Sequence, residues 1–330
     1  MALPRGKKRK TSKGAIFSEA EFQKSSMWFE DGNVVLVAEN TGYKVFKGVL
    51  SLHSEVFQDL FTLPQPQDAE IFDDCYVVRM PDSQQELACL LSAIHDSSSK
   101  YLDRDVVLSF PEVSSMLRVG SKYQVKHLRA EAVRRLKCCF PDNLDDYVTP
   151  RTRYDLPDDV WFPGAPISLE LGECIAVINL ARAHDLDCLL PAAFYACAQM
   201  TDRDLVFGFP GADGTRSTLS KEDLVRCLEG RASLVSAWRR DVELFLFCLP
   251  PCDEDRDPSV RSVWKHCLDM SAPLLDSTFV DDVLRLKPSG YCNGCVQAAR
   301  RSHNRLRQSV WDGLGEHFDL HPLGVDPNSE

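Results

Sequence analysis

The sequence predicts an α+β protein in which strands and helices of the first third are followed by a mainly α-helical C-terminal region. Short apolar runs rich in β-branched residues, such as Asn33–Glu39, alternate in the first third with apolar residues at helical spacing. Beyond residue 168 helical spacing dominates. With 330 residues, 44% of them hydrophobic and 26% charged, the chain has the composition of an ordinary globular protein.

The first elements are a hairpin and a pair of helices. Asn33–Glu39 is predicted to be a buried strand, Asn40–Gly42 a tight turn and Tyr43–Lys47 the returning strand. Apolar residues at helical offsets then predict two short helices that meet at Ser54, whose hydroxyl can cap the second. A third strand is expected over Tyr76–Met80.

Two capping boxes mark the next helices. Ser83–Glu86 and Ser109–Glu112 each place a serine three residues before a glutamate and ahead of an apolar stripe. Pro111 lies in the first turn of the second helix, where it costs no helical hydrogen bond. A further helix is predicted over Leu128–Leu136.

The remainder reads as loops and helices. Residues 141–167 are rich in proline, glycine and aspartate and are predicted to be a loop. The later predictions are helices at 174–181 and 189–199, an irregular connection over 202–215, a helix from Ser220, a mostly apolar helix or strand after Arg239, and a charged helix over Val296–Leu314. The expected divisions are a disordered basic tail (1–21), a sheet-and-helix domain (22–140), an acidic loop (141–167), a helical extension (168–240) and a cysteine-rich region with a terminal helix (241–330).

Charge is distributed unevenly. The formal net charge is -11, yet the first fourteen residues carry six basic side chains and no acid. An acidic body is repelled by phosphate backbones, so direct nucleic-acid binding is not expected. Four arginines of the terminal helix form a modest basic face, for which ion pairs within the chain or with a partner are the better explanation; they are Arg300, Arg301, Arg305 and Arg307.

The basic tail has two interpretations. Lys7, Lys8, Arg9 and Lys10 have the composition of a nuclear import signal, and a solvated tail is the alternative. No apolar stretch approaches the ~20 residues of a membrane span, and the N-terminus lacks the apolar core of a secretory signal. We therefore expect a nuclear or cytoplasmic protein without a membrane partner.

The thirteen cysteines fall into two groups. Eight lie among apolar residues and are predicted to fill the core: Cys75, Cys89, Cys138, Cys139, Cys174, Cys188, Cys197 and Cys227. The other five, Cys248, Cys252, Cys267, Cys292 and Cys295, gather in the final third.

The spacing Cys292-x-x-Cys295 suits two thiolate ligands of one zinc ion. A structural site needs two more ligands, for which Cys252 and Cys267 are our choices; His266, Cys248 and His303 are substitutes. The alternative is two unligated thiols at a helix start. A redox dithiol is disfavoured because no βαβ unit precedes the pair.

Catalytic motifs are absent from the sequence. It contains no G-x-S-x-G, H-E-x-x-H, G-x-x-x-x-G-K or G-x-G-x-x-G, and its eight histidines are dispersed. The aspartate-rich stretches at 142–159 and 253–257 lack the ligand spacing of a calcium loop. We do not expect an enzyme, and we expect no cofactor beyond the zinc.

The residues of the first third resemble a BTB/POZ domain, which implies a small mixed sheet flanked by helices over residues 22–140. The resemblance is carried, in order, by Asn33–Val37, Tyr43–Leu50, His53–Phe61 and Val77–Asp82. Asn33 stands where the family usually has Asp, and Phe46 stands where it usually has His. In many BTB transcription factors that Asp and a following basic residue form a charged pocket, of which Lys47 remains here.

Later segments are similar to the large BTB-containing family of mushroom-type (basidiomycete) fungi. They are Leu117–Tyr123, Val177–Arg182, Leu190–Tyr195, Leu219–Arg231 and Cys292–Cys295, so the likeness spans about residues 22–320. The resemblance implies a non-catalytic protein–protein interaction module that forms homo- or hetero-oligomers. The alternatives are a nuclear, transcription-associated regulator and a substrate adaptor for a cullin-type ubiquitin ligase.

Two groups of residues are expected to contact partners. Met27, Trp28 and Phe29 are large apolar residues ahead of the first predicted strand, where they either join a dimer interface or cover the chain's own core. Lys47, Phe57 and Phe61 lie on the predicted helical hairpin, which in this fold can pack against a second copy.

Phe110-x-Glu112 has the hydrophobic-x-Glu form of a cullin-docking motif. A helix cap explains Glu112 equally.

Overall fold

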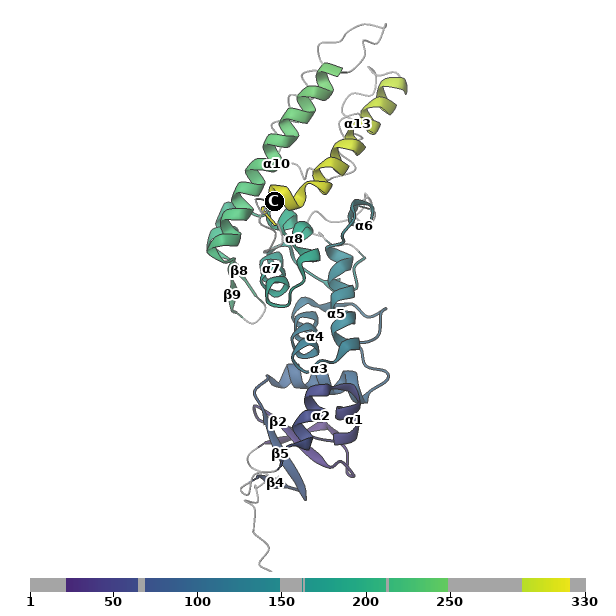
Figure 1. The fold of residues 1–330 in the computed structure, drawn as a ribbon, viewed down its shortest axis with the longest axis vertical. Helices are drawn as coiled ribbons and strands as arrows, with labels where there is room; N and C mark the ends of the chain where they lie inside the picture. Colours follow the sequence, from purple (N-terminus) through teal and green to yellow (C-terminus); the bar gives the residue numbers. More distant parts are fainter. Residues whose placement is uncertain are drawn as a thin grey trace, which may run out of the picture. The chain divides into compact units, whose positions relative to one another are not determined.

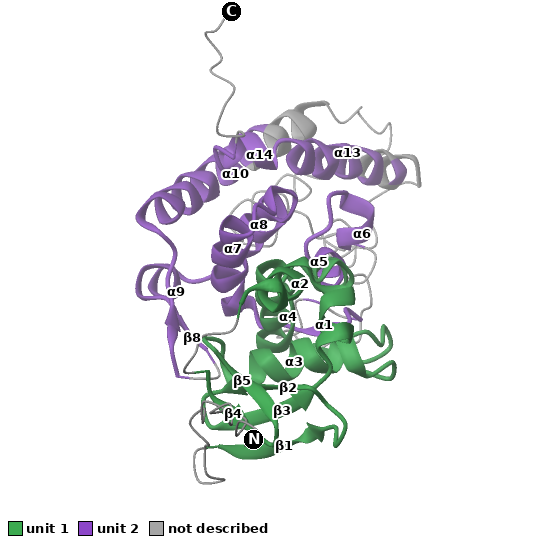
Figure 2. Ribbon diagram, turned by 60° about the horizontal axis from the view of Figure 1, so that its bottom comes forward, with its two compact units in different colours: residues 1–133 green, residues 134–330 purple. Residues whose placement is uncertain are grey.

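A computed structural model describes residues 22–64, 69–148, 162, 164–211, 214–248 and 293–320. The chain divides into two compact units, residues 1–133 and 134–330 (Figure 2). No helix within the described ranges is long and apolar enough to cross a membrane.

The first unit contains a mixed five-stranded sheet, with strands in the order β1-β3-β2-β5-β4 (Figure 1). The central strand β2 is antiparallel to β3 and parallel to β5, and all five of its residues are buried. The mixed sheet confirms the predicted fold class. The strands are β1 (Gln23–Trp28), β2 (Val34–Ala38), β3 (Thr41–Val45), β4 (Ile71–Phe72) and β5 (Cys75–Met80).

The β2–β3 turn lies earlier than the sequence predicted. Ala38 pairs with Thr41, so the turn residues are Glu39 and Asn40, and Glu39 has a φ of 50°. Gly42, which we assigned to the turn, lies in β3 instead. The ring of Phe22 lies 2.4 Å from where a Cβ on Gly42 would stand, so this glycine serves packing and not chain reversal.

Strand β1 was not predicted from the sequence. Its residues, QKSSMW, are mostly polar and half exposed, without the alternation of a buried strand. It is held at the sheet edge by parallel pairing with β3. Met27 and Trp28 therefore lie in a strand, and Trp28 packs against a core cluster formed by Phe22, Val35, Val37, Phe72 and Cys75.

The helical pair after the hairpin is confirmed. Helices α1 (Lys47–His53) and α2 (Glu55–Thr62) meet at Ser54. The Ser54 hydroxyl oxygen accepts a hydrogen bond from the backbone N–H of Phe57 at 3.2 Å. The same hydroxyl donates to the backbone carbonyl of Tyr123 at 2.6 Å, and so ties the helix start to a distant part of the unit.

Both capping boxes begin helices where predicted. In α3 (Gln84–His95), the Ser83 and Glu86 side chains each accept the other residue's backbone N–H. In α4 (Phe110–Lys122), the backbone N–H and the hydroxyl of Ser109 both donate to Glu112. Helix α5 (Lys126–Cys139) follows as expected, and the two-residue strand β6 (Leu108–Ser109) precedes α4.

The second unit is mainly helical, as predicted. Its helices are α6 (Leu144–Val148), α7 (Cys174–Ala183), α8 (Leu190–Cys197), α9 (Asp202–Phe207), α10 (Lys221–Cys248), α13 (Asn293–Asp312) and α14 (Leu314–His317). Short strands β7 (Ile167–Ser168), β8 (Phe209–Pro210) and β9 (Arg216–Ser217) and single 3-10 turns at Leu171–Glu173 and Asp187–Leu189 complete the described elements.

Three local predictions for this unit need correction or completion. Helix α6 lies inside the stretch predicted to be a loop, and α9 and β8 lie in the predicted irregular connection, just ahead of β9 with which β8 pairs. The Thr201 hydroxyl caps α9 by accepting the Asp204 N–H at 3.2 Å. The element after Arg239 is helical, because α10 continues to Cys248.

Aromatic residues and one buried carboxylate hold the second unit together. The ring of Phe318 packs on Phe194, with ring centroids 5.4 Å apart. It also lies 2.1 Å from where a Cβ on Gly230 would stand, so α10 comes close to α14. Asp223 is buried and accepts hydrogen bonds from Arg182 and Arg226 at 3.0 and 3.2 Å.

The cysteines predicted to fill the core do so with two exceptions. Cys138 and Cys188 are exposed, whereas the other six of that group are buried. Both exposed residues lie among apolar residues in the sequence, but in the structure Cys138 of α5 and Cys188 of a 3-10 turn face solvent. Burial raises the pKa of the Cys89 thiol to about 12, so this residue is an inert apolar side chain.

Candidate interaction surface of the first unit

Three residues from different elements meet on the surface of the first unit. Lys47 begins α1, Phe61 lies in the last turn of α2 and Tyr76 is the second residue of β5. The Lys47 Nζ lies 5.6 Å from the centroid of the Phe61 ring and 5.3 Å from that of Tyr76. We call Lys47, Phe61 and Tyr76 the lysine–aromatic patch.

Asn33 fixes the position of Lys47. The Asn33 side-chain oxygen accepts the backbone N–H of Lys47 at 2.8 Å, so it satisfies a donor at the start of α1 that has no helical partner. Phe46, just before α1, packs on Phe29 with ring centroids 5.2 Å apart. Asn33 and Phe46 are the two departures from the usual pattern, and each has a structural role here.

Phe61 is supported by a row of stacked rings that leads into the core. Its ring stacks on Phe57 at 5.8 Å, and Phe57 stacks on Tyr123 at 5.0 Å with an interplanar angle of 8°. Phe57 is 0% exposed. Phe57 therefore cannot contact a binding partner directly, and its contribution to the patch is to hold the Phe61 ring in place.

The row ends in a buried polar group. The Tyr123 hydroxyl donates to Asp82, and the Lys122 Nζ donates to the same carboxylate at 2.6 Å. Burial, reinforced by the hydrogen bond to Asp82, raises the pKa of Tyr123 well above its ordinary value. Tyr123 therefore stays protonated and continues to donate.

The patch combines a cation with exposed aromatic surface. Tyr76 is 37% exposed, and Leu63, directly after α2, is 60% exposed. A lysine held over aromatic faces is attracted by the ring quadrupoles and keeps its ammonium group available. Aromatic residues are enriched in protein interfaces whereas lysine is depleted from them, so the rings of Phe61 and Tyr76 are the interface-like part of the patch. Lys47 and Phe61 are two of the residues predicted to contact partners, whereas Tyr76 was predicted only as part of a strand.

Of the segment Met27, Trp28 and Phe29, the two aromatic residues have ring partners inside their own unit. Trp28 meets Phe72 edge-on at 5.9 Å and lies under the Lys24 Nζ at 4.7 Å. Phe29 stacks on His95 with ring centroids 5.8 Å apart. These contacts support the interpretation that the segment covers the chain's own core, and its participation in a dimer stays a prediction.

Most of the predicted zinc ligands lie outside the described residues. These are Cys252, Cys267 and Cys292; Cys295 lies in the first turn of α13. In the described ranges, no group of three or more His, Cys, Asp or Glu side chains is placed to hold a metal ion. The zinc site stays a prediction.

The predicted basic segments are only partly described. The tail with Lys7, Lys8, Arg9 and Lys10 lies outside the described residues. On α13 the side chains of Arg300, Arg301 and Arg305 are exposed, whereas Arg307 is 8% exposed and so is not part of a basic face.

Glu112 of the Phe110-x-Glu112 motif is engaged within the unit. Its carboxylate accepts hydrogen bonds from Ser109 and, at 2.5 Å, from the Lys100 Nζ. Burial acts to raise the pKa of Glu112, but the bonds from Lys100 and Ser109 outweigh it and the pKa is lowered. Phe110 is 7% exposed. These contacts are those of a helix cap.

The first unit is an α+β domain made of a small mixed sheet and helices. Residues 26–137 match the family model of the BTB/POZ domain, and this part of the chain is a BTB/POZ domain. Domains of this family mediate protein–protein interaction and self-association. No curated protein and no solved structure matches the chain.

Proposed function

We propose that the protein is a non-catalytic interaction protein that binds partners, including a second copy of itself, through its BTB/POZ domain. The observation that carries the proposal is the lysine–aromatic patch, in which the Lys47 ammonium group lies within 5.6 Å of the Phe61 ring centroid and 5.3 Å of that of the exposed Tyr76. Membership of the protein in the BTB-containing family of mushroom-type fungi stays a prediction.

The chemistry of the patch indicates what a partner should present. An apolar or aromatic side chain would pack on Tyr76 and Leu63, and a carboxylate would pair with Lys47. A partner that supplies both would bury the aromatic surface while satisfying the cation, so neither group is left unpaired in the interface.

The test compares one patch variant with a matched exposed control. Tyr76→Glu places a charge in the patch, and Val107→Glu places one at a residue that is 60% exposed elsewhere in the unit. Light scattering on the full chain measures the oligomeric state, and affinity purification with mass spectrometry identifies bound proteins. We expect Tyr76→Glu to lose the oligomer or the partners, and Val107→Glu to keep them. Equal behaviour of the two variants would contradict the proposal.

A nuclear, transcription-associated role is a second candidate, supported by the composition of Lys7–Lys10 and by the CxxC at Cys292. Deleting residues 1–14 should remove a fluorescent fusion from the nucleus if this segment is an import signal. Metal analysis of the purified protein tests the zinc separately, with about one equivalent expected and a content near zero ending that proposal.

A cullin adaptor role receives no support from the contacts of Glu112, because capping and the Lys100 ion pair account for that residue. A pull-down that recovers a cullin with the full chain, and loses it with Phe110→Ala, would restore this candidate.

A further inference from the structure

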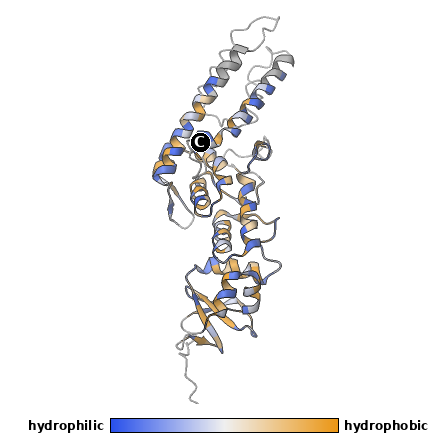
Figure 3. Ribbon diagram, in the orientation of Figure 1, coloured by the Kyte–Doolittle hydropathy of each residue, from blue (hydrophilic) through white to orange (hydrophobic). Residues whose placement is uncertain are grey.

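Helix α10 of the second unit has two apolar faces. The inner face is buried, and its members are Cys227, Gly230, Leu234 and Ala237. A second apolar row is exposed: Val225 is 50% exposed, Leu228 38% and Val235 39%, and Ala232 is also exposed. We call Val225, Leu228, Ala232 and Val235 the outer stripe. Figure 3 shows apolar and polar residues mixed along this helix.

The spacing of the outer stripe is that of a coiled-coil seam. Its members follow one another by three, four and three residues, which is the alternation of the a and d positions of a heptad. At about 100° per residue these four side chains fall on one side of the helix. A lone exposed valine needs no explanation, but a row at seam spacing presents the surface that a second helix packs against.

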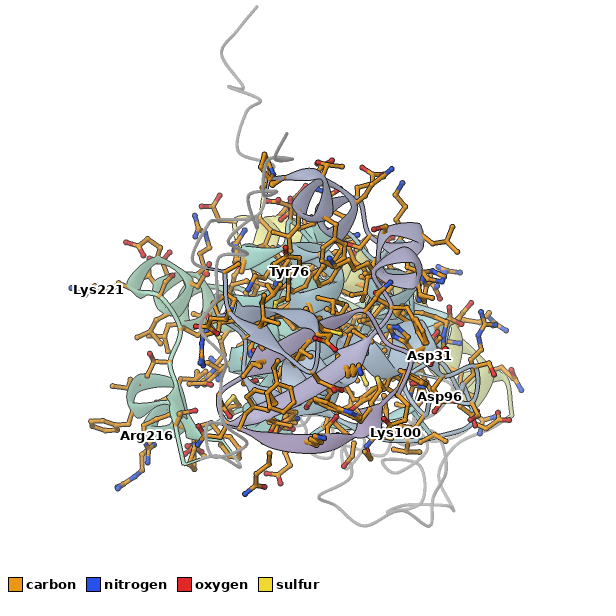
Figure 4. All side chains as sticks on the ribbon, turned by 90° about the horizontal axis from the view of Figure 1, so that it is seen from below. Asp31, Tyr76, Asp96, Lys100, Arg216 and Lys221 are labelled. Carbon is orange, nitrogen blue, oxygen red and sulfur yellow. The ribbon has the colours of Figure 1, made fainter. Side chains whose placement is uncertain are left out.

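A cation stands in line with the outer stripe at each end. Lys221 lies four residues before Val225, Arg239 lies four residues after Val235, and both are exposed. Lys221 projects outward from its helix in Figure 4. Heptad spacing places both residues at seam positions, so they face whatever covers the stripe.

We propose that the outer stripe binds an amphipathic helix of another protein, whose apolar seam ends in carboxylates. The helix would pack its apolar side chains on Val225, Leu228 and Val235, and its carboxylates would pair with Lys221 and Arg239. Because a cation stands at each end, the charges match whether the helix runs parallel or antiparallel to α10.

The same charges disfavour a second copy of this chain. In a parallel pair of α10 helices, Lys221 of one copy faces Lys221 of the other, and Arg239 faces Arg239. Antiparallel pairing sets Lys221 of one copy against Arg239 of the other. Like charges facing each other across a seam select against a pairing, so both directions of self-association are penalised. The surface lies outside residues 26–137 and does not depend on the function proposed for the BTB/POZ domain.

The probe is a labelled synthetic helical peptide with leucine at its seam positions and glutamate at two seam positions spaced like Lys221 and Arg239. The control peptide has the same sequence except for lysine at those two positions. Binding to the full chain is measured by fluorescence anisotropy, at a concentration where sedimentation shows the peptide to be monomeric. The glutamate peptide forms two ion pairs where the lysine peptide meets two like charges. This difference in binding free energy is about 1.4 kcal/mol or more, so the glutamate peptide should bind about tenfold more tightly than the lysine peptide.

Variants of the chain locate the binding. Val225→Glu should weaken binding of the glutamate peptide about tenfold or more, since it buries a charge against leucine. Val206→Glu is the matched control, because Val206 is 51% exposed against 50% for Val225 and lies on α9. The double variant Lys221→Glu/Arg239→Glu should prefer the lysine peptide. Circular dichroism checks that each variant is folded.

The proposal is overturned if neither peptide binds, if both bind equally, or if Val206→Glu weakens binding as much as Val225→Glu. It is also overturned if light scattering shows an oligomer of the chain that Val225→Glu dissociates, because the stripe would then be a self-pairing surface.

Discussion

The Lys44 Nζ lies 2.6 Å from Asp73 Oδ2, and the lysine is buried while the aspartate is half exposed, with side-chain exposures of 6% and 46%. The same ammonium group donates to the backbone carbonyl of Glu30 at 2.9 Å. Lys44 thus joins the β1–β2 connection and the β4–β5 turn from β3. The hydrogen bond from Lys44 lowers the pKa of Asp73, and the pKa of Lys44 is raised for the same reason.

This inequality in burial predicts unequal effects of removing each partner. Asp73→Asn leaves a buried ammonium without its counter-charge, and should lower the free energy of unfolding by about 1–3 kcal/mol. Asparagine tolerates the φ of 49° at this position, so backbone strain is not added. Lys44→Met keeps the apolar stem, leaves a carboxylate that water can solvate and removes the bond to the Glu30 carbonyl, and should cost about 1 kcal/mol.

Urea denaturation of the two single variants and the double variant measures both costs and their coupling. Equal losses for the two single variants would contradict the assignment of Lys44 as the buried partner. Because the pKa of Asp73 is lowered, its contribution to stability is present above its ordinary pKa of 3.8 and is lost as pH falls below it.

Two glycines of the first unit should respond oppositely to alanine. A Cβ on Gly120 of α4 would stand 2.8 Å from the backbone nitrogen of Arg129, so α4 and α5 would have to separate. Gly120→Ala should therefore destabilise by about 1–3 kcal/mol. Gly48 of α1 has nothing within 4 Å of such a Cβ, and Gly48→Ala should stabilise by about 0.5–1 kcal/mol because alanine loses less entropy in a helix. Thermal unfolding of both variants gives the signs, and a shared sign would refute the prediction.

The sequence carried enough information for elements whose signals are local. The Ser83–Glu86 box and the cap at Ser54 each satisfy backbone groups within one turn, so their pattern is visible without tertiary contacts. Strand β1 was missed because parallel pairing with β3, and not its own polar residues, holds it in the sheet.

The candidate site likewise combines residues that local signals predict with one that depends on tertiary contacts. Lys47 and Phe61 could be proposed from the helical hairpin, but their meeting with Tyr76 depends on how β5 lies beside the hairpin. Phe57 looked like a surface anchor because it shares the helix with Phe61. Phe57 and Phe61 lie one turn apart on the same side of α2, and Phe57 is the buried one because its ring stacks on Tyr123. Helix period alone does not reveal the neighbour.

His95 should make stability depend on pH. Burial lowers its pKa below the ordinary 6.5, and His53 nearby acts in the same direction, against the bond to the Leu91 carbonyl. The unfolded chain therefore binds a proton more readily, and the free energy of unfolding should fall as pH drops from above 6.5 toward the lowered pKa.

The variant His95→Phe removes the titrating group and keeps a ring against Phe29. Chemical denaturation at a series of pH values should show a shallower slope for the variant below pH 6.5, where the parent chain loses stability. Some slope should remain, since burial also lowers the pKa of His317 in the second unit. An unchanged slope would show that His95 is not the group that binds the proton.

Tyr123 should affect stability without affecting partner binding. Tyr123→Phe keeps the stack on Phe57 but removes the hydroxyl that donates to Asp82, and should cost about 1–2 kcal/mol of unfolding free energy. The loss is limited because Lys122 still pairs with Asp82 at 2.6 Å.

At the exposed Tyr76, the matched change Tyr76→Phe should alter stability by less than about 0.5 kcal/mol. Urea denaturation measures these effects, and affinity purification of the Tyr123→Phe variant should recover the parent's partners, since the rings beneath Phe61 stay in place. Loss of those partners together with unchanged stability would mean that the Tyr123 hydroxyl acts at the surface and not beneath it.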